Sequence, residues 1–542
     1  MKADIRQAVE HHLGFDRLRG GQEEAIEAVL TGRDTLAVMP TGSGKSAIYQ
    51  VACSLVEGST VVVSPLIALQ RDQVEAVAAL DVGEATQLNS TVGAGDRRQA
   101  FEEAQAGDLD FLFLAPEQLR NEDTLRTLAE APPSLFVVDE AHCISAWGHD
   151  FRPDYLHLPP VIEALGRPTV LALTATASPH VRQDIVRGLD LRDPVVIVTG
   201  FDRPNIYLEV RGFREESDKR QALVEQVQEA DGPGIVYVAT RRAAEQLAEA
   251  LVERGVGAAA YHAGLSGRRR HEVQESFMEG DLEVVVATVA FGMGIDKADV
   301  RFVYHHDVTD SLDSYHQEIG RAGRDGEPAE AILFYRPEDL GIRRYFSSVG
   351  RLQTEDIEGL LQAALVEDAP PKRLTREQLR ERSGLSDAKL LLALKRLEEV
   401  GVLQSSGEDQ VELVDSQPNL PAVIEEAMGL DEAREQMDRS RVDMIRSYAE
   451  SRGCRRQFLL NYFGEQLSEP CGACDNCHRG QDLETGQSLP FPVDTRVLHG
   501  EWGEGLVVRY EEDKVFVLFD QVGYKTLSVD LVRQGDLLHA QN

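Results

Sequence analysis

A glycine-rich stretch, MPTGSGKSAI at residues 39–48, follows a short apolar run and precedes a helical pattern. Glycines in such a loop let backbone N–H groups turn toward a phosphate, the lysine reaches the β- and γ-oxygens, and the serine ligates Mg²⁺. The core G-x-G-K-[ST] is intact, although Pro40 stands at the first position of the longer motif. An ordinary glycine turn is the alternative, and the apolar run favours the nucleotide site. The predicted nucleotide ligands here are Thr41, Gly42, Ser43, Gly44, Lys45 and Ser46.

Two carboxylates end another apolar run, LFVVDEAH, at Asp139 and Glu140. Phosphoryl transfer needs one carboxylate for the metal and one to polarise the attacking water. We therefore predict that Asp139 and Ser46 hold Mg²⁺ and that Glu140 acts on the water. A solvated loop end would explain a lone acidic pair, but this pair accompanies a phosphate loop.

Two arginines lie about one helical turn apart in QEIGRAGRDG. Guanidinium groups suit a γ-phosphate whose charge spreads as it is cleaved, and ones from a second lobe would reach it across a cleft. Hydrolysis would then require closure, which makes ATP turnover a mechanical cycle. We assign catalysis to Lys45, Asp139, Glu140, Arg321 and Arg324, and a nucleotide contact to Gln317.

An aromatic-rich stretch, HCISAWGHDFRPDY, directly follows the carboxylates. Aromatic faces stack on unpaired bases, worth about 1 to 3 kcal/mol per base, and they accept any sequence. A loop tied to the catalytic strand can report strand occupancy to the ATP site, whereas an ordinary packed turn is the alternative. The predicted nucleic-acid contacts are Trp147, His149, Phe151, Arg152 and Tyr155.

Four cysteines follow the pattern C-x16-C-x2-C-x2-C, at Cys454, Cys471, Cys474 and Cys477. Thiolates at this spacing close a tetrahedral zinc site with no open position, so the predicted Zn²⁺ is structural. A redox C-x-x-C is the main alternative, disfavoured because the pairs overlap outside any βαβ unit. His478 is a competing ligand for the position of Cys477.

The ordered motifs resemble those of superfamily 2 helicases and specifically of the RecQ family of DNA helicases, over about residues 14–326 and 441–480. They include GFDRLRGGQ, MPTGSGKS, SPLIALQRDQV, DEAH, LTATAS, ATVAFGMGIDKADVRFVYHHD and SYHQEIGRAGRDG. The resemblance implies that Phe15 and Arg19 flank the adenine and that Gln22 reads its edge. It also implies that His142 couples the two lobes. The implied activity is ATP-dependent 3′–5′ translocation on single-stranded DNA, with unwinding of duplex or branched DNA in recombination and repair.

Short β-branched runs alternate with helical patterns over residues 34–200, and the alternation restarts after GFDRPN. Such alternation predicts parallel sheets covered on both faces. The predicted fold class is α/β: two tandem RecA-like lobes, a winged-helix-like domain, a helical zinc-binding module and a small C-terminal β-barrel. The expected boundaries are 1–200, 201–340, 341–425, 426–482 and 493–542.

Residues 341–425 read as a winged helix placed before the zinc module, unlike the best-known RecQ layout. A T-x-x-Q capping box at Thr375 opens one helix, Gly384 ends it, Ser386 caps the next, and Gly401 stops that one before a two-stranded wing. Phosphate contacts on the second helix are one expectation, and a purely structural winged helix is the other. The basic candidates on that helix are Lys389, Lys395 and Arg396.

The net charge is −36, and 47 of the 56 basic residues are arginine. A nucleic-acid binder usually carries basic surface, so a local basic groove is required. An acidic, lysine-poor surface fits either concentrated salt or a GC-rich genome. The chain lacks an apolar leader or membrane-length segment, so we expect a cytoplasmic protein without a membrane partner.

The acidic stretch 493–542 resembles the Tudor-like barrel at the C-terminus of UvrD-type helicases through its glycine and aromatic spacing. This implies a protein partner in repair or transcription, such as RNA polymerase, with a stability cap as the alternative. For the whole chain, an RNA helicase and an ATP-switched scaffold without unwinding activity are the competing interpretations.

Overall fold

The computed structural model describes most of the chain, and two predicted site residues, Phe15 and His149, lie outside the described part. The chain divides into two compact units, residues 1–339, 445–489 and 508–512 in the first and the remainder in the second. The described residues are 1–14, 18–65, 67–80, 82–89, 92–145, 147–148, 150–292, 295–341, 352–365, 373–405, 410–414, 418–480, 490–492, 495–511, 513–520, 522–534 and 537–540.

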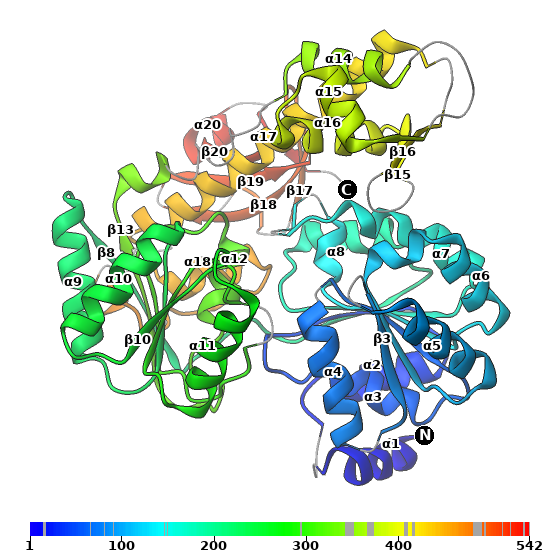
Figure 1. Ribbon diagram of the computed structural model, residues 1–542. Coiled ribbons are helices and arrows are strands. Elements are labelled where there is room, and N and C mark those ends of the chain that lie inside the picture. Colours follow the sequence, from blue (N-terminus) through cyan, green and yellow to red (C-terminus); the bar gives the residue numbers. More distant parts are fainter. Residues whose placement is uncertain are drawn as a thin grey trace. The chain divides into compact units, whose positions relative to one another are not determined.

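The first sheet has seven parallel strands in the order β3-β4-β2-β5-β6-β1-β7. Its central strands are buried apolar runs, as expected where helices cover both faces of a parallel sheet (Figure 1). The strands are β1 (Thr35–Val38), β2 (Thr60–Val63), β3 (Ala85–Leu88), β4 (Phe111–Leu114), β5 (Leu135–Val138), β6 (Thr169–Thr174) and β7 (Val195–Val198).

The helices of this first lobe pack their apolar sides into one core with the strands. The α-helices are α1 (Lys2–Ala8), α2 (Gln22–Leu30), α3 (Ser46–Cys53), α4 (Ile67–Ala79), α5 (Ala94–Ala106), α6 (Glu122–Glu130), α7 (Leu158–Ala164) and α8 (Pro179–Gly188). Shorter turns are η1 (Val9–Leu13), η2 (Pro116–Arg120), η3 (Ala141–Ile144) and η4 (Pro153–His157).

The second sheet has six parallel strands in the order β10-β11-β9-β12-β13-β8. The strands are β8 (Ile206–Gly212), β9 (Gly234–Tyr237), β10 (Ala258–Tyr261), β11 (Val284–Ala287), β12 (Phe302–His305) and β13 (Ala329–Tyr335). The accompanying helices are α9 (Glu216–Glu229), α10 (Arg241–Glu253), α11 (Gly267–Glu279), α12 (Leu312–Ile319) and η5 (Pro337–Asp339). Both parallel lobes of the predicted fold class are therefore confirmed.

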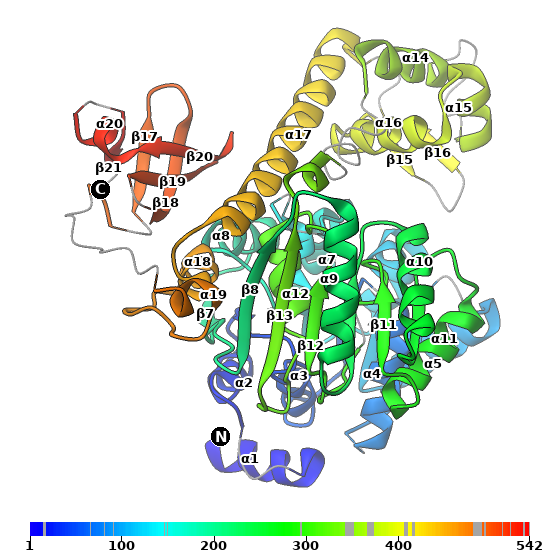
Figure 2. The ribbon, with the colours of Figure 1, turned by 90° about the vertical axis from the view of Figure 1, so that its left-hand side faces the viewer.

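A 31-residue helix, α17 (Leu420–Glu450), leads into the cysteine region (Figure 2). This region contains α18 (Arg455–Tyr462) and α19 (Asp475–His478). It lies on the edge of the second sheet, where Cys474 forms an isolated parallel bridge with Leu208 of β8. The part of the predicted zinc module from residue 445 onward is thus a neighbour of lobe 2 within the first unit, whereas residues 426–444 belong to the second unit.

The second unit contains the winged-helix-like region around its own apolar core. Its elements are α14 (Thr354–Ala364), β14 (Arg373–Thr375), α15 (Arg376–Ser383), α16 (Asp387–Glu399), β15 (Leu403–Ser405) and β16 (Gln410–Leu413). The capping box forms as predicted, with Thr375 Oγ1 accepting from the Gln378 N–H at 3.2 Å. Gly384 and Gly401 end the two helices with φ of 67° and 78°.

Two of the three basic candidates on α16, Lys389 and Arg396, form ion pairs within this unit. Arg396 is buried and pairs with Asp431 at 3.0 Å and Glu399 at 3.2 Å, and Lys389 pairs with Asp356 at 2.6 Å. These contacts favour the structural interpretation of the helix over phosphate binding.

The C-terminal segment forms a five-stranded antiparallel sheet in the order β20-β19-β18-β17-β21. The elements are β17 (Arg496–His499), β18 (Gly503–Glu511), β19 (Lys514–Phe519), β20 (Gly523–Ser528), α20 (Val529–Gln534) and β21 (His539–Ala540). The predicted all-β region is present, and its closure into a barrel stays a prediction.

Candidate nucleotide and zinc sites

The phosphate loop joins β1 to the N-terminus of α3. Gly42 and Gly44 have φ of 77° and 78°, in the left-handed region that favours glycine. The loop therefore turns sharply and ends at the N-terminus of α3, whose positive dipole end suits an anion. Lys45 lies at this junction, and its ammonium donates to the Met39 carbonyl at 3.3 Å.

Lys45, Asp139 and Glu140 lie close enough to influence one another electrostatically. Burial lowers the pKa of Lys45, while the carboxylates of Glu140 and Asp139 oppose this shift. Burial first and Glu140 second raise the pKa of Asp139. Glu140 has φ of 48°, an uncommon backbone conformation for a residue with a side chain, directly after β5. The three predicted catalytic groups of the first lobe thus converge at the carboxyl ends of its strands.

Ser46 and Asp139 offer a hydroxyl and a carboxylate, the hard oxygen ligands that Mg²⁺ prefers. When bound, this ion neutralises charge on the phosphate oxygens. The Ser46 hydroxyl is oriented by Gln73, whose Nε2 donates to it at 3.2 Å and whose Oε1 accepts from Tyr49 at 2.7 Å. Sequence reasoning missed Gln73, although it lies in the quoted stretch SPLIALQRDQV.

Arg19 and Gln22 both contact the phosphate loop. The Arg19 guanidinium donates to the Gly42 carbonyl, and Gln22 Nε2 donates to the carbonyls of Ser43 and Gly44 at 3.0 and 2.8 Å. Gln22 Oε1 accepts from the Arg19 N–H at 2.7 Å. These residues brace the loop, and their contacts with adenine stay a prediction.

The two predicted arginines differ in their surroundings. Arg324 of the second lobe lies against the phosphate loop, since a Cβ built on Gly42 would stand 3.3 Å from Arg324 Cδ. Its guanidinium also donates to the Ile295 carbonyl at 2.8 Å and to Asp296 at 2.5 Å. Arg321 is buried, and its Nε has no hydrogen-bond partner among the described residues. Gln317 is half-buried on α12.

His142 contacts groups of the first lobe. Its Nδ1 lies 3.2 Å from Glu140 Oε2 and 2.8 Å from the hydroxyl of Thr174, at the end of β6. The imidazole thereby joins the DEAH and LTATAS motifs. The expected coupling of the two lobes by His142 is not visible in these contacts and stays a prediction.

The aromatic stretch after Glu140 is largely packed. Tyr155 is fully buried and Trp147 is 7% exposed, with its ring edge-on to His180 at 5.3 Å. Phe151 and Arg152 are half-buried, and Arg152 donates to the Pro65 carbonyl at 2.8 Å. Of the aromatic rings described here, Phe151 is the more accessible for stacking.

The four cysteines of the predicted zinc site come together. Their sulfur atoms all lie within 4.8 Å of one another, and Cys471 and Cys477 are 4.0 Å apart. Tetrahedral Zn–S bonds of about 2.3 Å place sulfurs about 3.8 Å apart, so the four thiolates fit Zn²⁺. His478 instead stacks on Tyr207 with ring centroids 5.4 Å apart, which removes it as the competing ligand.

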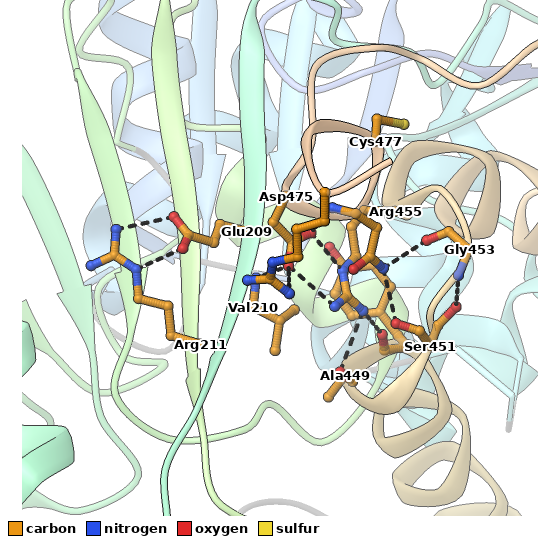
Figure 3. Close-up of polar contacts among 12 residues, drawn as sticks. Glu209, Val210, Arg211, Ala449, Ser451, Gly453, Arg455, Asp475 and Cys477 are labelled. Atoms are coloured by element: carbon orange, nitrogen blue, oxygen red, sulfur yellow. Dashed lines mark hydrogen bonds and ion pairs between the residues drawn. The ribbon is translucent and has the colours of Figure 1, made fainter. Parts of the chain in front are cut away.

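Asp475, between two of the cysteines, anchors the zinc region to lobe 2 (Figure 3). Its carboxylate accepts from Arg455 at 3.0 and 3.3 Å and from the Val210 N–H of β8 at 3.3 Å. Arg455 also donates to the Ala449 carbonyl at 3.3 Å. Asn476 Nδ2 donates to the Ser451 carbonyl at 2.9 Å. The metal site therefore holds the end of α17, α18 and the edge of the second sheet together.

Comparison with known proteins agrees with this arrangement. Family models match for a DEAD/DEAH box helicase over residues 19–185, the helicase conserved C-terminal domain over 218–326 and RecQ zinc-binding over 414–478. A probable ATP-dependent DNA helicase, RecS of Bacillus subtilis, is 35% identical over 482 residues, covering 88% of this chain and 92% of that protein. The chain belongs to the RecQ family of ATP-dependent DNA helicases.

Other relatives of this RecQ-family chain are longer. The ATP-dependent DNA helicase RecQ of Pasteurella multocida is 36% identical over 475 residues, covering 88% of this chain and 62% of that protein. A crystal structure of the DUF1998 helicase MrfA bound to DNA has a TM-score of 0.53 at 18% identity and covers 77% of this chain and 63% of that one. At this identity it supports the fold alone. Within the described residues, no helix is both long and apolar enough to cross a bilayer.

Proposed function

We propose that this RecQ-family chain is a 3′–5′ DNA helicase that translocates on single-stranded DNA and unwinds duplex or branched DNA in recombination and repair. The observation that carries the proposal is the approach of Arg324, from the second lobe, to Gly42 in the phosphate loop of the first. Groups from both lobes then meet one phosphate chain, so cleavage of ATP changes the contact between the lobes. That change moves the lobes along a bound strand.

ATP binds with its phosphates on residues 41–46, held by Lys45 and by the N-terminus of α3. Glu140 orients the attacking water, while Arg321 and Arg324 stabilise charge on the γ-phosphate as it leaves. Phe15, Arg19 and Gln22 hold the adenine, and Gln317 adds a contact from α12. These assignments rest on residue chemistry and on the convergence of the loop, the carboxylates and Arg324.

The aromatic stretch senses single-stranded DNA. Phe151 and Arg152 contact unpaired bases and phosphates together with His149, and Trp147 and Tyr155 hold the loop in shape or become available when it moves. Support comes from the position of the stretch, which follows Glu140 directly and is bonded to the catalytic strand.

Lobe 2 carries a group of arginines that sequence reasoning missed, of which Arg268 and Arg269 pair with Glu272. The first turns of α10 and α11 carry arginines and no acidic residue, the reverse of the usual preference at a helix N-terminus. Both turns follow strands of one parallel sheet, at its carboxyl edge. The sequence signals were TRR and GRRR in a chain of net charge −36, and the residues are Arg241, Arg242, Arg268, Arg269 and Arg270. We assign phosphate contacts to this edge.

A strand-displacement assay tests the function directly. Duplexes with a 3′ tail, a 5′ tail or an RNA duplex are compared, with Lys45→Ala as the inactive control. Unwinding of the 3′-tailed DNA alone is expected. Preference for the RNA duplex would support an RNA helicase, and DNA-stimulated ATP hydrolysis without strand separation would support an ATP-switched scaffold.

The C-terminal sheet is the second functional surface, and we assign it a protein partner in repair or transcription. Trp502 stacks on His499 at 4.1 Å, and Lys525 lies 5.8 Å from the Trp502 ring centroid. This aromatic group sits in an acidic segment that repels phosphate, so a protein is the better fit. A cytoplasmic location and the five domain boundaries given above complete the proposal.

A further inference from the structure

The segment between the two lobes, residues 200–205, is called the interlobe segment here. It is held by a hydrogen bond, a ring stack and an ion pair from the zinc region. Glu465 accepts a hydrogen bond of 2.6 Å from the Phe201 N–H, and the rings of Phe201 and Phe463 stack at 4.6 Å. Arg456 pairs with Asp202 at 3.1 Å. Gly200 passes so close that an added Cβ would stand 3.1 Å from the Glu465 carboxylate. The position of this segment is therefore set by residues that follow α17.

The same segment meets the first lobe and α12. The Arg182 guanidinium of α8 lies 5.6 Å from the Phe201 ring centroid and donates to the Phe463 carbonyl at 2.5 Å. His316 Nε2 on α12 lies 3.1 Å from the Phe201 carbonyl oxygen. Phe201 is fully buried by these groups. It is thus the point where α8, α12 and the zinc region meet.

Arg203, two residues further on, holds the loop that carries the two catalytic arginines. Its guanidinium donates to three carbonyls of that loop: Gly320 at 2.8 Å, Ala322 at 2.7 Å and Gly323 at 2.9 Å. Asn205 adds a bond of 2.8 Å to Gly323. The main chain on both sides of Arg321 is thereby fixed to the interlobe segment.

Arg324 directly follows Gly323 in the chain, and its side chain lies against Gly42 of the phosphate loop. A continuous series of contacts runs from Glu465 and Arg456, through the interlobe segment, to Arg324 beside the phosphate loop. Displacement of a reacting group by about 1 Å costs on the order of 10²-fold in rate, so the anchoring of this loop matters for turnover.

We propose that Arg203 is a positioning residue for ATP hydrolysis, which fixes the loop carrying Arg321 and Arg324 and ties its placement to the zinc region through Phe201 and Asp202. The inference rests on the proposed role of those two arginines. A planar guanidinium with several fixed donors can bridge three carbonyls, whereas a lysine ammonium on a flexible stem cannot hold them in one geometry.

The test uses the full chain with Arg203→Ala and Arg203→Lys. The matched control is Arg211→Ala, because Arg211 is also half-buried in lobe 2 and is bonded to Glu209 at 2.8 Å and Gln226 at 2.7 Å, away from the loop. We expect both Arg203 variants to lose on the order of 10²-fold in DNA-stimulated kcat, with the KM for ATP within about three-fold of the parent. Zinc content should be unchanged, and Arg211→Ala should keep its kcat.

A binding measurement distinguishes a loss of loop positioning from a general loss of folded structure. ADP with tetrafluoroaluminate mimics the transferring phosphoryl group, so the Arg203 variants should bind this pair more weakly than the parent but bind ADP alone equally well. Equal affinity of the parent and Arg203→Lys for both ligands would overturn the proposal. If Arg203→Ala fails to fold, Arg203→Lys carries the same comparison.

A cycle with Arg321→Ala and Arg324→Ala combined distinguishes this proposal from the proposed function. Since Arg203 acts through the loop that carries both arginines, Arg203→Lys should add little to the loss caused by the two alanine substitutions together. Losses that multiply would contradict the positioning role. Full turnover in Arg324→Ala would instead refute the assigned role of the arginine, which is a different failure.

Discussion

The phenolic hydroxyl of Tyr155 donates a hydrogen bond of 2.9 Å to the main-chain carbonyl of Asp139. Tyr155 belongs to the aromatic stretch assigned to single-stranded DNA, and Asp139 is the predicted metal ligand. The bond closes the chain between them into a loop whose two ends are fixed together. Under the proposed function, a movement of the stretch on binding a strand would reach the main chain of Asp139 through this bond.

Tyr155→Phe should therefore weaken this transmission while the ring stays packed. Removal of one hydrogen bond costs about 1 kcal/mol, a modest loss in stability. We expect DNA-stimulated ATP hydrolysis to fall several-fold, with basal hydrolysis within about two-fold of the parent at that cost. Steady-state turnover with and without single-stranded DNA measures both values.

Tyr335→Phe is the control, because the Tyr335 hydroxyl makes a comparable bond of 2.7 Å to Glu450 far along the chain. It should leave the stimulation intact. An equal loss of basal and stimulated rates in Tyr155→Phe would indicate a packing role for the tyrosine.

Lys45→Ala should abolish ATP hydrolysis and leave the fold intact. The substitution removes a phosphate contact at the start of α3 and a single bond to the Met39 carbonyl. Its ammonium is already held at a lowered pKa by burial, so its loss relieves a desolvation cost. Turnover and thermal unfolding are compared with Lys2→Ala, an exposed lysine paired with Glu27 at 3.1 Å. DNA-stimulated turnover in the variant would refute the assignment of the loop.

The sequence was most informative where chemistry and local turns coincide. The phosphate loop, the capping box at Thr375 and the cysteine cluster depend on residue types at fixed spacing, and each forms as predicted. The central strands were also predicted, because buried parallel strands are continuous apolar runs. The edge strands β3 (Ala85–Leu88) and β8 (Ile206–Gly212) were missed, since their half-buried patterns include polar residues.

Contacts between distant segments were beyond sequence reasoning. The pairing of Arg396 with Asp431, or of Arg203 with the carbonyls of Gly320, Ala322 and Gly323, depends on how the chain folds back on itself. From sequence alone, an arginine on a presumed recognition helix is predicted to contact DNA, because its acidic partner elsewhere in the chain cannot be identified. Burial of Trp147 and Tyr155 is a similar case, because an aromatic-rich loop has the same composition whether packed or exposed.

Cys471→Ser should lower zinc content and soluble yield, because a four-thiolate site contributes to folding directly. The effect should extend to the edge of lobe 2, since Asp475 ties the cysteine region to Val210. Cys53→Ser is the control, a buried cysteine of lobe 1 outside the cluster. Metal analysis of purified protein measures the difference, and full zinc occupancy in Cys471→Ser would refute its assignment as a ligand.

A charged cluster in lobe 2 predicts a pH-dependent stability. His306 lies 3.2 Å from Glu216 and 3.1 Å from Asp307. Burial acts to lower the pKa of His306, but the adjacent carboxylates of Asp307 and Glu216 outweigh it and raise the pKa. The hydrogen bond from His306, together with Lys219, lowers the pKa of Glu216 to about 2 despite partial burial.

The raised pKa of His306 means that its contribution is complete below about pH 6.5 and is lost as the pH rises through the folded value. The contribution of Glu216 is complete above about pH 4.5 and is lost toward pH 2. His306→Gln should therefore lower Tm most near pH 6 and least near pH 9. His271→Gln, on the exposed side of α11, is the control, and a Tm difference independent of pH would contradict the charge-based explanation.

Truncation after Pro492 should leave unwinding within a few-fold of the full chain at matched salt and abolish at least one protein contact in a pull-down. The segment removed is acidic, and its positive charges are partly neutralised internally, as where Arg496 pairs with Asp520 at 2.7 Å and Glu504 at 3.4 Å. Such a surface repels DNA, so its removal should not lower DNA affinity.

A point variant tests whether the exposed surface of the C-terminal sheet, rather than the mere presence of the segment, makes the protein contact. Leu498, on the edge-proximal strand β17, is 40% exposed, and Leu498→Asp should lose the same protein contact while the sheet remains folded. The control is Val252→Asp, an exposed apolar residue on α10 of lobe 2. If truncation instead removes DNA binding, the C-terminal sheet faces nucleic acid despite its charge, and the assignment of a protein partner is wrong.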